Sequence, residues 1–107
     1  MIAPVFAAGT NLLRTVQGHL VRGTFLNRAT IRFPAAVLGA SAASALGIDQ
    51  AGGRAQVWLG GHWFAVAGIM APAPLAPELD RAVLIGLPIA RSLLHARAAT
   101  LAGSALT

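Results

Sequence analysis

The alternation of apolar and polar residues is clearest in the middle of the chain, where it predicts a β-hairpin. Two runs rich in aromatic and β-branched residues, 56–59 and 62–69, flank the pair Gly60-Gly61. A two-residue hairpin turn requires positive φ angles, which glycine adopts without a steric penalty. The two glycines therefore mark the turn between two paired strands.

The second strand of this predicted hairpin is apolar on both faces. With side chains alternating along a strand, Trp63 and Ala65 share one face while Phe64 and Val66 share the other. We therefore expect both faces to be covered by other parts of the molecule. Trp58, Trp63 and Phe64 are interpreted as packing pairs across the hairpin, and a ligand-stacking surface is the alternative.

Shorter patterns on either side complete the predicted fold. Apolar runs predict buried strands at 35–38 and 82–87, and a strand or turn at 20–26. Helices are predicted at 11–17, in the Ala-rich run that Gly47 ends, and after Pro88, which can open a helix. The fold class expected is α+β, with a small mixed sheet, a central β-hairpin and two short helices. We expect a single domain over residues 1–107, with residues 95–107 left unassigned.

A proline-spaced segment separates the hairpin from the second buried strand. Residues 71–77 read Ala-Pro-Ala-Pro-Leu-Ala-Pro. Proline has no backbone N–H to donate to a sheet, so this segment is predicted to be an extended loop outside the sheet. The only acidic cluster, Glu78 and Asp80, follows at once and is interpreted as a turn or ion-pair element.

Composition adds a second expectation, which is that some apolar surface is covered by something else. The chain is 56% hydrophobic and 10% charged, against about 25% charged residues in typical soluble domains. Few charges remain to cover the surface, which favours contact with the rest of a larger protein, a partner or a membrane.

The net charge of +5 comes from eight arginines without any lysine. Four of these arginines precede the first acidic residue, Asp49, and such a basic segment can contact phosphate in nucleic acid or in anionic lipid. No aromatic or basic recognition motif accompanies the arginines, so solvated surface side chains are the favoured interpretation and no nucleic acid is expected.

No arrangement of reactive residues predicts catalysis. The chain has no cysteine, and its three histidines, His19, His62 and His95, are too scattered to form a metal-ligand motif. Glu78 and Asp80 lack a surrounding polar shell for acid–base chemistry. We therefore expect no catalytic residue, no cofactor and no metal site.

The longest uncharged stretch, residues 55–77, is long enough to span a bilayer. It contains Gln56, His62, a glycine pair and three prolines, and it alternates as a strand does. We therefore expect no transmembrane helix within it, and the first ten residues lack the basic region that begins a signal peptide.

Four segments, in order and spacing, resemble the extracytoplasmic (periplasmic) core domain of MacB/FtsX-type ABC transporter permeases. They are residues 18–27 with the run Arg-Gly-Thr-Phe-Leu, residues 34–48 with Pro-Ala-Ala-Val-Leu-Gly, residues 57–70 ending in Val-Ala-Gly-Ile-Met, and residues 74–88. The resemblance covers about residues 11–94. It implies a mixed α/β domain between the first two transmembrane helices of a permease in a bacterial cell membrane.

The resemblance also implies a function. Such a domain is non-enzymatic and couples the motion of a separate ATPase subunit, through the transmembrane helices, to a lipoprotein, lipid or cell-wall partner outside the cytoplasm. The residues expected to contact a partner are those at exposed loop tips, namely Gly60, Gly61, Pro72, Pro74, Leu75 and Pro77. The alternative is a stand-alone basic module that self-associates or binds an anionic partner.

Overall fold

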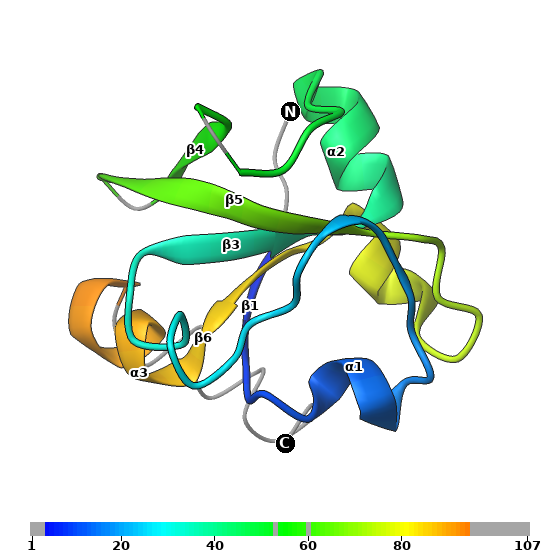
Figure 1. The fold of residues 1–107 in the computed structure, drawn as a ribbon, viewed down its shortest axis with the longest axis horizontal. Coiled ribbons are helices and arrows are strands. Elements are labelled where there is room, and N and C mark those ends of the chain that lie inside the picture. The colour runs from blue at the N-terminus through cyan, green and yellow to red at the C-terminus, as the bar shows by residue number, and fades with distance from the viewer. Residues whose placement is uncertain (1–3, 53, 60, 95–107) are drawn as a thin grey trace.

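The computed structural model describes residues 4–52, 54–59 and 61–94, which form one mixed sheet with short helices around it (Figure 1). The strands are β1 (Val5–Ala8), β2 (Leu20–Gly23), β3 (Ala35–Leu38), β4 (Gln56–Leu59), β5 (His62–Met70) and β6 (Val83–Gly86). The helices are α1 (Leu12–Thr15), α2 (Ala40–Leu46) and α3 (Leu87–Ile89), with a 3-10 turn η1 (Pro77–Arg81) and a π-helical turn η2 (Ala90–Leu94). The expected α+β fold with a small mixed sheet is confirmed. Each of the three segments predicted as helical contains or overlaps one of these α-helices, whereas the expected fold class named two helices.

Strand β5 organises the sheet because it pairs with three others. The strand order is β1-β6-β3-β5-β2, and β4 pairs with β5 outside that path. The first part of β5 pairs with β4 and its last part with β2, both antiparallel, while β3 runs parallel along its other edge. Beyond β3, β6 is antiparallel to β3 and parallel to β1.

The predicted hairpin and the predicted helix end are both confirmed. Leu59 of β4 pairs with His62 of β5, which leaves a two-residue turn. Gly61 has φ +85°, as such a turn requires, while Gly60 lies outside the described residues. Gly47 ends α2 in the left-handed conformation, with φ +70°.

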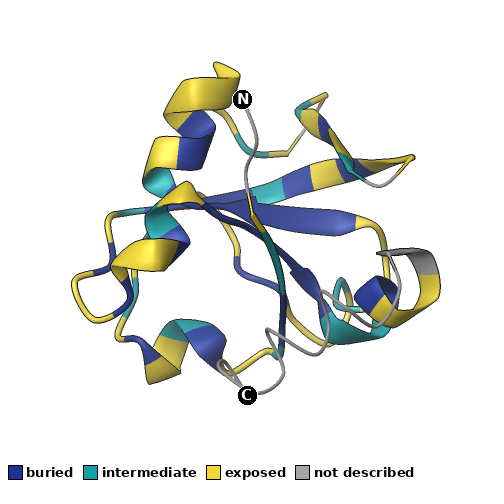
Figure 2. Ribbon diagram, turned by 180° about the vertical axis from the view of Figure 1, so that it is seen from behind, coloured by how far each residue is buried: buried dark blue, intermediate teal, exposed yellow. Residues whose placement is uncertain are grey.

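The core lies between the sheet and the elements that cover it (Figure 2). Strands β3 and β6 are buried along their whole lengths. The largest side chains that are fully buried come from several elements: Phe64, Leu12, Leu38, Met70, Leu79, Leu84 and Ile85. Buried side chains in the described ranges include no polar or charged residue.

The expectation that β5 is covered on both faces is wrong for its first half. Phe64 and Val66 are buried, but Trp63 is 57% exposed and Ala65 is exposed. The hairpin is the part of the sheet that extends beyond the elements packed around β3 and β6 (Figures 1 and 2). A chain of this size has too few elements to cover both faces of every strand.

Helix α2 packs directly on η1, and this contact positions the loop described below. The N–H of Gly39 donates to the carbonyl of Ala82 at 2.9 Å. A Cβ at Gly39 would meet the carbonyl oxygen of Leu79 and the carbonyl carbon of Asp80, the latter at 2.6 Å. Only glycine therefore fits where α2 begins.

None of the helices in the described part of the chain has both the length and the apolar character that crossing a membrane requires.

Candidate interaction site

The proline-spaced segment leaves the sheet at the carboxyl end of β5 and forms the exposed loop that the sequence predicts. Pro72, Pro74, Leu75 and Pro77 are exposed, and Leu75 is 62% exposed. Between them Ala73 and Ala76 are buried and belong to the core cluster. The loop therefore presents apolar side chains to solvent while its small residues anchor it to the core. We call residues 71–77 the proline loop.

Hydrogen bonds from Ala71 and Ala73 hold the proline loop at two points. The N–H of Ala71 donates to the carbonyl of His19 at 2.8 Å. The N–H of Ala73 donates to Oδ1 of Asp80 at 3.0 Å, in a partly buried position. Within the loop, the N–H of Ala76 donates to the carbonyl of Ala73 at 3.1 Å. The backbone that carries the exposed side chains is thus fixed rather than free.

The role of Asp80 can be predicted only in part from the sequence. Its position beside the proline loop indicated a turn element, and the structure shows that its carboxylate holds the loop by a side-chain-to-backbone hydrogen bond. The six residues between Ala73 and Asp80 hide this pairing from any local pattern. An acidic residue shortly after a proline-rich loop is the only signal in the sequence.

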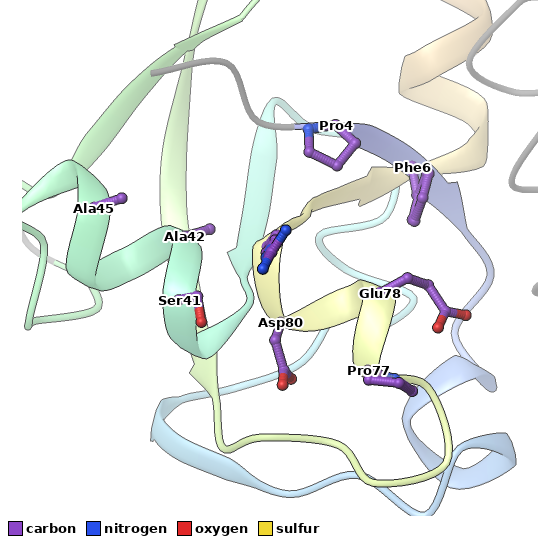
Figure 3. A pocket seen from close by; sticks show the side chains of 9 residues that line it. Pro4, Phe6, Ser41, Ala42, Ala45, Pro77, Glu78 and Asp80 are labelled. Carbon is purple, nitrogen blue, oxygen red and sulfur yellow. The ribbon is translucent and has the colours of Figure 1, made fainter.

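A hollow of about 860 Å³ lies beside the proline loop, between β1, α2 and η1 (Figure 3). Five apolar residues line it, Pro4, Phe6, Ala42, Ala45 and Pro77, together with the four polar or charged residues Ser41, Glu78, Asp80 and Arg81. Pro77 belongs to both the loop and the hollow, so that a partner seated in the hollow would also contact the loop.

The two carboxylates of this hollow do not converge. Glu78 and Asp80 lie two residues apart on a 3-10 turn. With three residues per turn, side chains at this spacing point about 120° away from each other around the helix axis. Figure 3 shows the two carboxylates pointing in different directions. Paired acid–base chemistry requires two groups that face one substrate, and this pair does not provide it.

The hairpin tip, the second expected contact, lies far from the first. Gly61 is exposed at the amino end of β5, whereas the proline loop begins after its carboxyl end. A nine-residue strand at about 3.3 Å per residue separates them by about 26 Å. The structure therefore places the expected contact residues in two separate surfaces, one at each end of the sheet.

The histidines and the other candidate ligands are also kept apart. The backbone of His19 lies near the carboxyl end of β5, where it bonds to Ala71, and His62 begins β5 at the opposite end. His95 lies outside the described residues. Within residues 4–52, 54–59 and 61–94, no three His, Cys, Asp or Glu side chains come together in a way that could hold a metal ion.

The two tryptophans pair across the hairpin, as the favoured interpretation predicts. Trp58 and Trp63 are directly opposite in register, with ring centroids 5.0 Å apart and an interplanar angle of 70°. This edge-to-face arrangement is favourable for aromatic rings. Both rings remain more than half exposed, at 58% and 57%, which alternation of residues along β5 does not predict.

Comparison with family models, with curated proteins and with solved structures finds no match to this chain.

Proposed function

We propose that this chain is a non-enzymatic extracytoplasmic module of an ABC transporter permease of the MacB/FtsX type. The observation that carries the proposal is the order and spacing of the segments that resemble that family. In support, the segments at 34–48, 57–70 and 74–88 contribute β3, β5 and β6 with the helical turns between them. These strands are β5, β3 and β6 in spatial order and form the middle of one sheet.

The proposed role is mechanical coupling. Transmembrane helices of the parent permease would move this domain when a separate ATPase subunit closes in the cytoplasm. A hydrogen-bonded sheet whose outer loop is also fixed moves as one body, so a displacement at one point reaches the others. The hydrogen bond between the N–H of Ala73 and the Asp80 carboxylate makes the proline loop move together with the sheet.

The partner contact in this proposal is the proline loop together with the hollow beside it. Exposed Pro72, Pro74, Leu75 and Pro77 offer apolar area on a preformed backbone. Ordering a loop in advance lowers the entropy lost on binding. A lipoprotein, a lipid or a cell-wall component outside the cytoplasm is the expected partner.

The first test is the DNA sequence on both sides of this reading frame. Frames that encode long apolar helices and an ATPase with a phosphate-binding loop support the proposal. Flanks that encode neither contradict it.

A second test exploits the absence of cysteine from the chain. A Leu75→Cys variant carries one thiol on the exposed loop, and a membrane-impermeant maleimide should label it in intact cells. Leu84→Cys, at a fully buried position, is the matched control and should not react until the protein is unfolded. Labelling of Leu75→Cys only after lysis would contradict an extracytoplasmic location.

The alternative, a stand-alone basic module, is favoured by one observation, the number of large apolar side chains that stay exposed. Val21, Phe33, Trp58, Trp63 and Leu75 are each more than half exposed. Sedimentation across a range of concentrations distinguishes self-association through this surface from a monomer. Binding of an anionic partner would weaken steeply between low and moderate salt, whereas an apolar interface between copies would not.

A further inference from the structure

Large exposed aromatic side chains gather at the amino end of β5. Trp58 and Trp63 form the exposed pair on the hairpin. Phe33, which is 62% exposed, lies two residues before β3, and the first residue of β3 pairs with Ala65 of β5. The parallel register therefore places Phe33 at the same end of the sheet as Trp63. We call the surface formed by these three aromatic residues and by Arg28, Arg32 and Arg91 the hairpin end.

Basic side chains lie at this same end. Arg32 immediately precedes Phe33 and is exposed. Arg91 is exposed on η2, which follows α3 beyond the carboxyl end of β6. Because β6 is antiparallel to β3, its carboxyl end lies beside the amino end of β3. Figures 1 and 2, seen from opposite sides, both place the α3–η2 segment at the end of the molecule where the hairpin lies.

Arg28 adds a third positive charge near this end. It lies in a turn in which Oδ1 of Asn27 accepts from the N–H groups of Ala29 and Thr30, at 2.8 Å and 3.1 Å. The carbonyl of Ile31, at the end of this turn, lies against Gly86, the last residue of β6. The turn is thereby held against the carboxyl end of β6.

The three acidic side chains of the chain lie toward the other end of the sheet. Glu78 and Asp80 belong to η1, just before the amino end of β6. Asp49 lines a hollow together with Met70 and Pro72, at the carboxyl end of β5. Ile69, which lines that hollow with Asp49, is six positions along β5 from Trp63, or about 20 Å. The four-residue strand β6, about 10 Å long, separates η1 from the carboxyl end of β6. Both spans exceed the screening length of about 8 Å at physiological salt, so the carboxylates offset the positive potential of the hairpin end only in part.

We infer that the hairpin end binds the surface of an anionic lipid bilayer. Tryptophan prefers the boundary between lipid headgroups and acyl chains, because its ring is apolar while its N–H can bond to water or headgroups. Arginines beside such rings are attracted to negatively charged headgroups. Trp58, Trp63 and Phe33 supply the apolar contact, and Arg28, Arg32 and Arg91 supply the charge.

Single-stranded nucleic acid is the other anionic partner that binds surfaces with both basic and aromatic residues. The geometry of the tryptophan pair favours lipid over nucleic acid. Bases stack on aromatic faces that are open to them. In the 70° arrangement the edge of one indole meets the face of the other, and this contact occupies part of that stacking surface. Lipid headgroups and acyl chains make no such demand on ring orientation.

The chain provides its own probe for this inference, because Trp58 and Trp63 are its only two tryptophans. The purified full chain is titrated with vesicles of phosphatidylcholine alone or with about one third phosphatidylglycerol, and tryptophan emission and co-flotation are measured. We expect a blue shift and flotation with the anionic vesicles, both weakened by added salt. Quenching by lipids brominated on the acyl chains should locate the rings at the interface. The assay uses the isolated chain and does not depend on the permease proposal.

Matched charge reversals test the location of the surface. The double variant Arg32→Glu and Arg91→Glu should bind anionic vesicles at least about tenfold more weakly. Arg22→Glu with Arg81→Glu carries the same net charge, but places the change beside Asp49 and the η1 carboxylates. This control should retain most of the binding. All four arginines are exposed, and circular dichroism will show whether each variant is folded.

Removing aromatic side chains tests the apolar contact while keeping one probe. Trp58→Ala leaves Trp63 as the reporter and should lower vesicle affinity, whereas Val21→Ala, which removes an exposed apolar side chain on β2 beside the carboxyl end of β5, should not.

Four outcomes would overturn the inference: no shift with anionic vesicles, equal binding to neutral and anionic vesicles, equal loss in the two charge-reversal variants, or a blue shift that appears on raising protein concentration without lipid. The last would assign the surface to a second copy of this chain. A shift produced by single-stranded DNA but not by vesicles would assign it to nucleic acid instead.

Discussion

The carboxylate of Asp80 accepts a hydrogen bond from the backbone N–H of Ala73 at 3.0 Å, and this contact joins the proline loop to η1. Because η1 packs against the start of α2, the exposed loop is connected to the helix and through it to the sheet. An otherwise extended, proline-rich segment thereby becomes a fixed part of the fold.

Removing this acceptor should loosen the loop and lower stability. Asp80→Ala leaves the N–H of Ala73 without its side-chain partner and should cost about 1.5 kcal/mol, near the lower value for a bond to a charged group, because the site is only partly buried. Urea unfolding measures the loss, and amide exchange at Ala73 should accelerate.

Two variants make this prediction specific. Asp80→Asn keeps an acceptor oxygen and should lose less stability than Asp80→Ala. Glu78→Ala, at an exposed position on the same turn, should stay within about 0.5 kcal/mol of the parent chain. Equal losses at both acidic positions would show that the hydrogen bond does not hold the loop.

The junction between α2 and η1 should not tolerate a side chain at Gly39. A Cβ there would lie 2.6 Å from the carbonyl carbon of Asp80 and still closer to the carbonyl oxygen of Leu79. Both atoms belong to backbone, so Gly39→Ala must displace the helix and should cost about 2 kcal/mol or more. Thermal and urea unfolding measure this loss.

Gly9→Ala is the matched control, because its Cβ would meet nothing within 4 Å. Its stability should change little. A Gly39→Ala variant as stable as Gly9→Ala would refute the close packing of α2 on η1.

Two phenylalanines give a matched test of where the core lies. Phe64 is fully buried, and Phe64→Ala should cost about 3–5 kcal/mol from lost apolar burial and the cavity left behind. Phe33 is 62% exposed, and Phe33→Ala should stay within about 0.5 kcal/mol of the parent chain. Urea unfolding of both variants checks the difference. Similar losses would contradict the assignment of Phe64 to the core and Phe33 to the surface.

The pairing of Trp58 with Trp63 should appear as a coupling energy. In a double-mutant cycle with alanine at each position, the edge-to-face contact should contribute about 0.5–1 kcal/mol beyond the two single losses. Both rings are exposed, so the value should lie at the lower end of the range for aromatic pairs. Unfolding free energies of the four proteins measure it, and a coupling of zero would show that the rings do not interact in solution.

Most individual elements could be predicted from the sequence because their signals are local. The glycine pair between two β-rich runs predicts the β4–β5 hairpin, and Gly47 after an Ala-rich run predicts the end of α2. The strand β3 was predicted with the bounds that the structure shows, and β6 to within one residue at each end. In each case a short pattern of breakers and apolar residues determines the backbone.

Strand β1 was not predicted, and neither were the neighbours of each strand. Residues Val5–Ala8 carry no alternation, and this strand exists because it pairs with β6, more than seventy residues later. The position of β3 between β5 and β6 likewise depends on pairings between distant segments. Such pairings follow from the packing of the whole core, which no window of sequence contains.

The candidate surfaces divide in the same way. Local sequence is enough to predict that residues 71–77 form a loop outside the sheet, because proline cannot join a sheet interior, and that a glycine turn separates the two hairpin strands. The positions of these surfaces at opposite ends of β5, and the hydrogen bond by which Asp80 holds the loop, depend on tertiary packing. Tertiary packing also decided that Trp63 faces solvent rather than the core. The physical reason is that the exposure of a strand face depends on which elements remain to cover it, and this becomes settled only when the entire chain has packed.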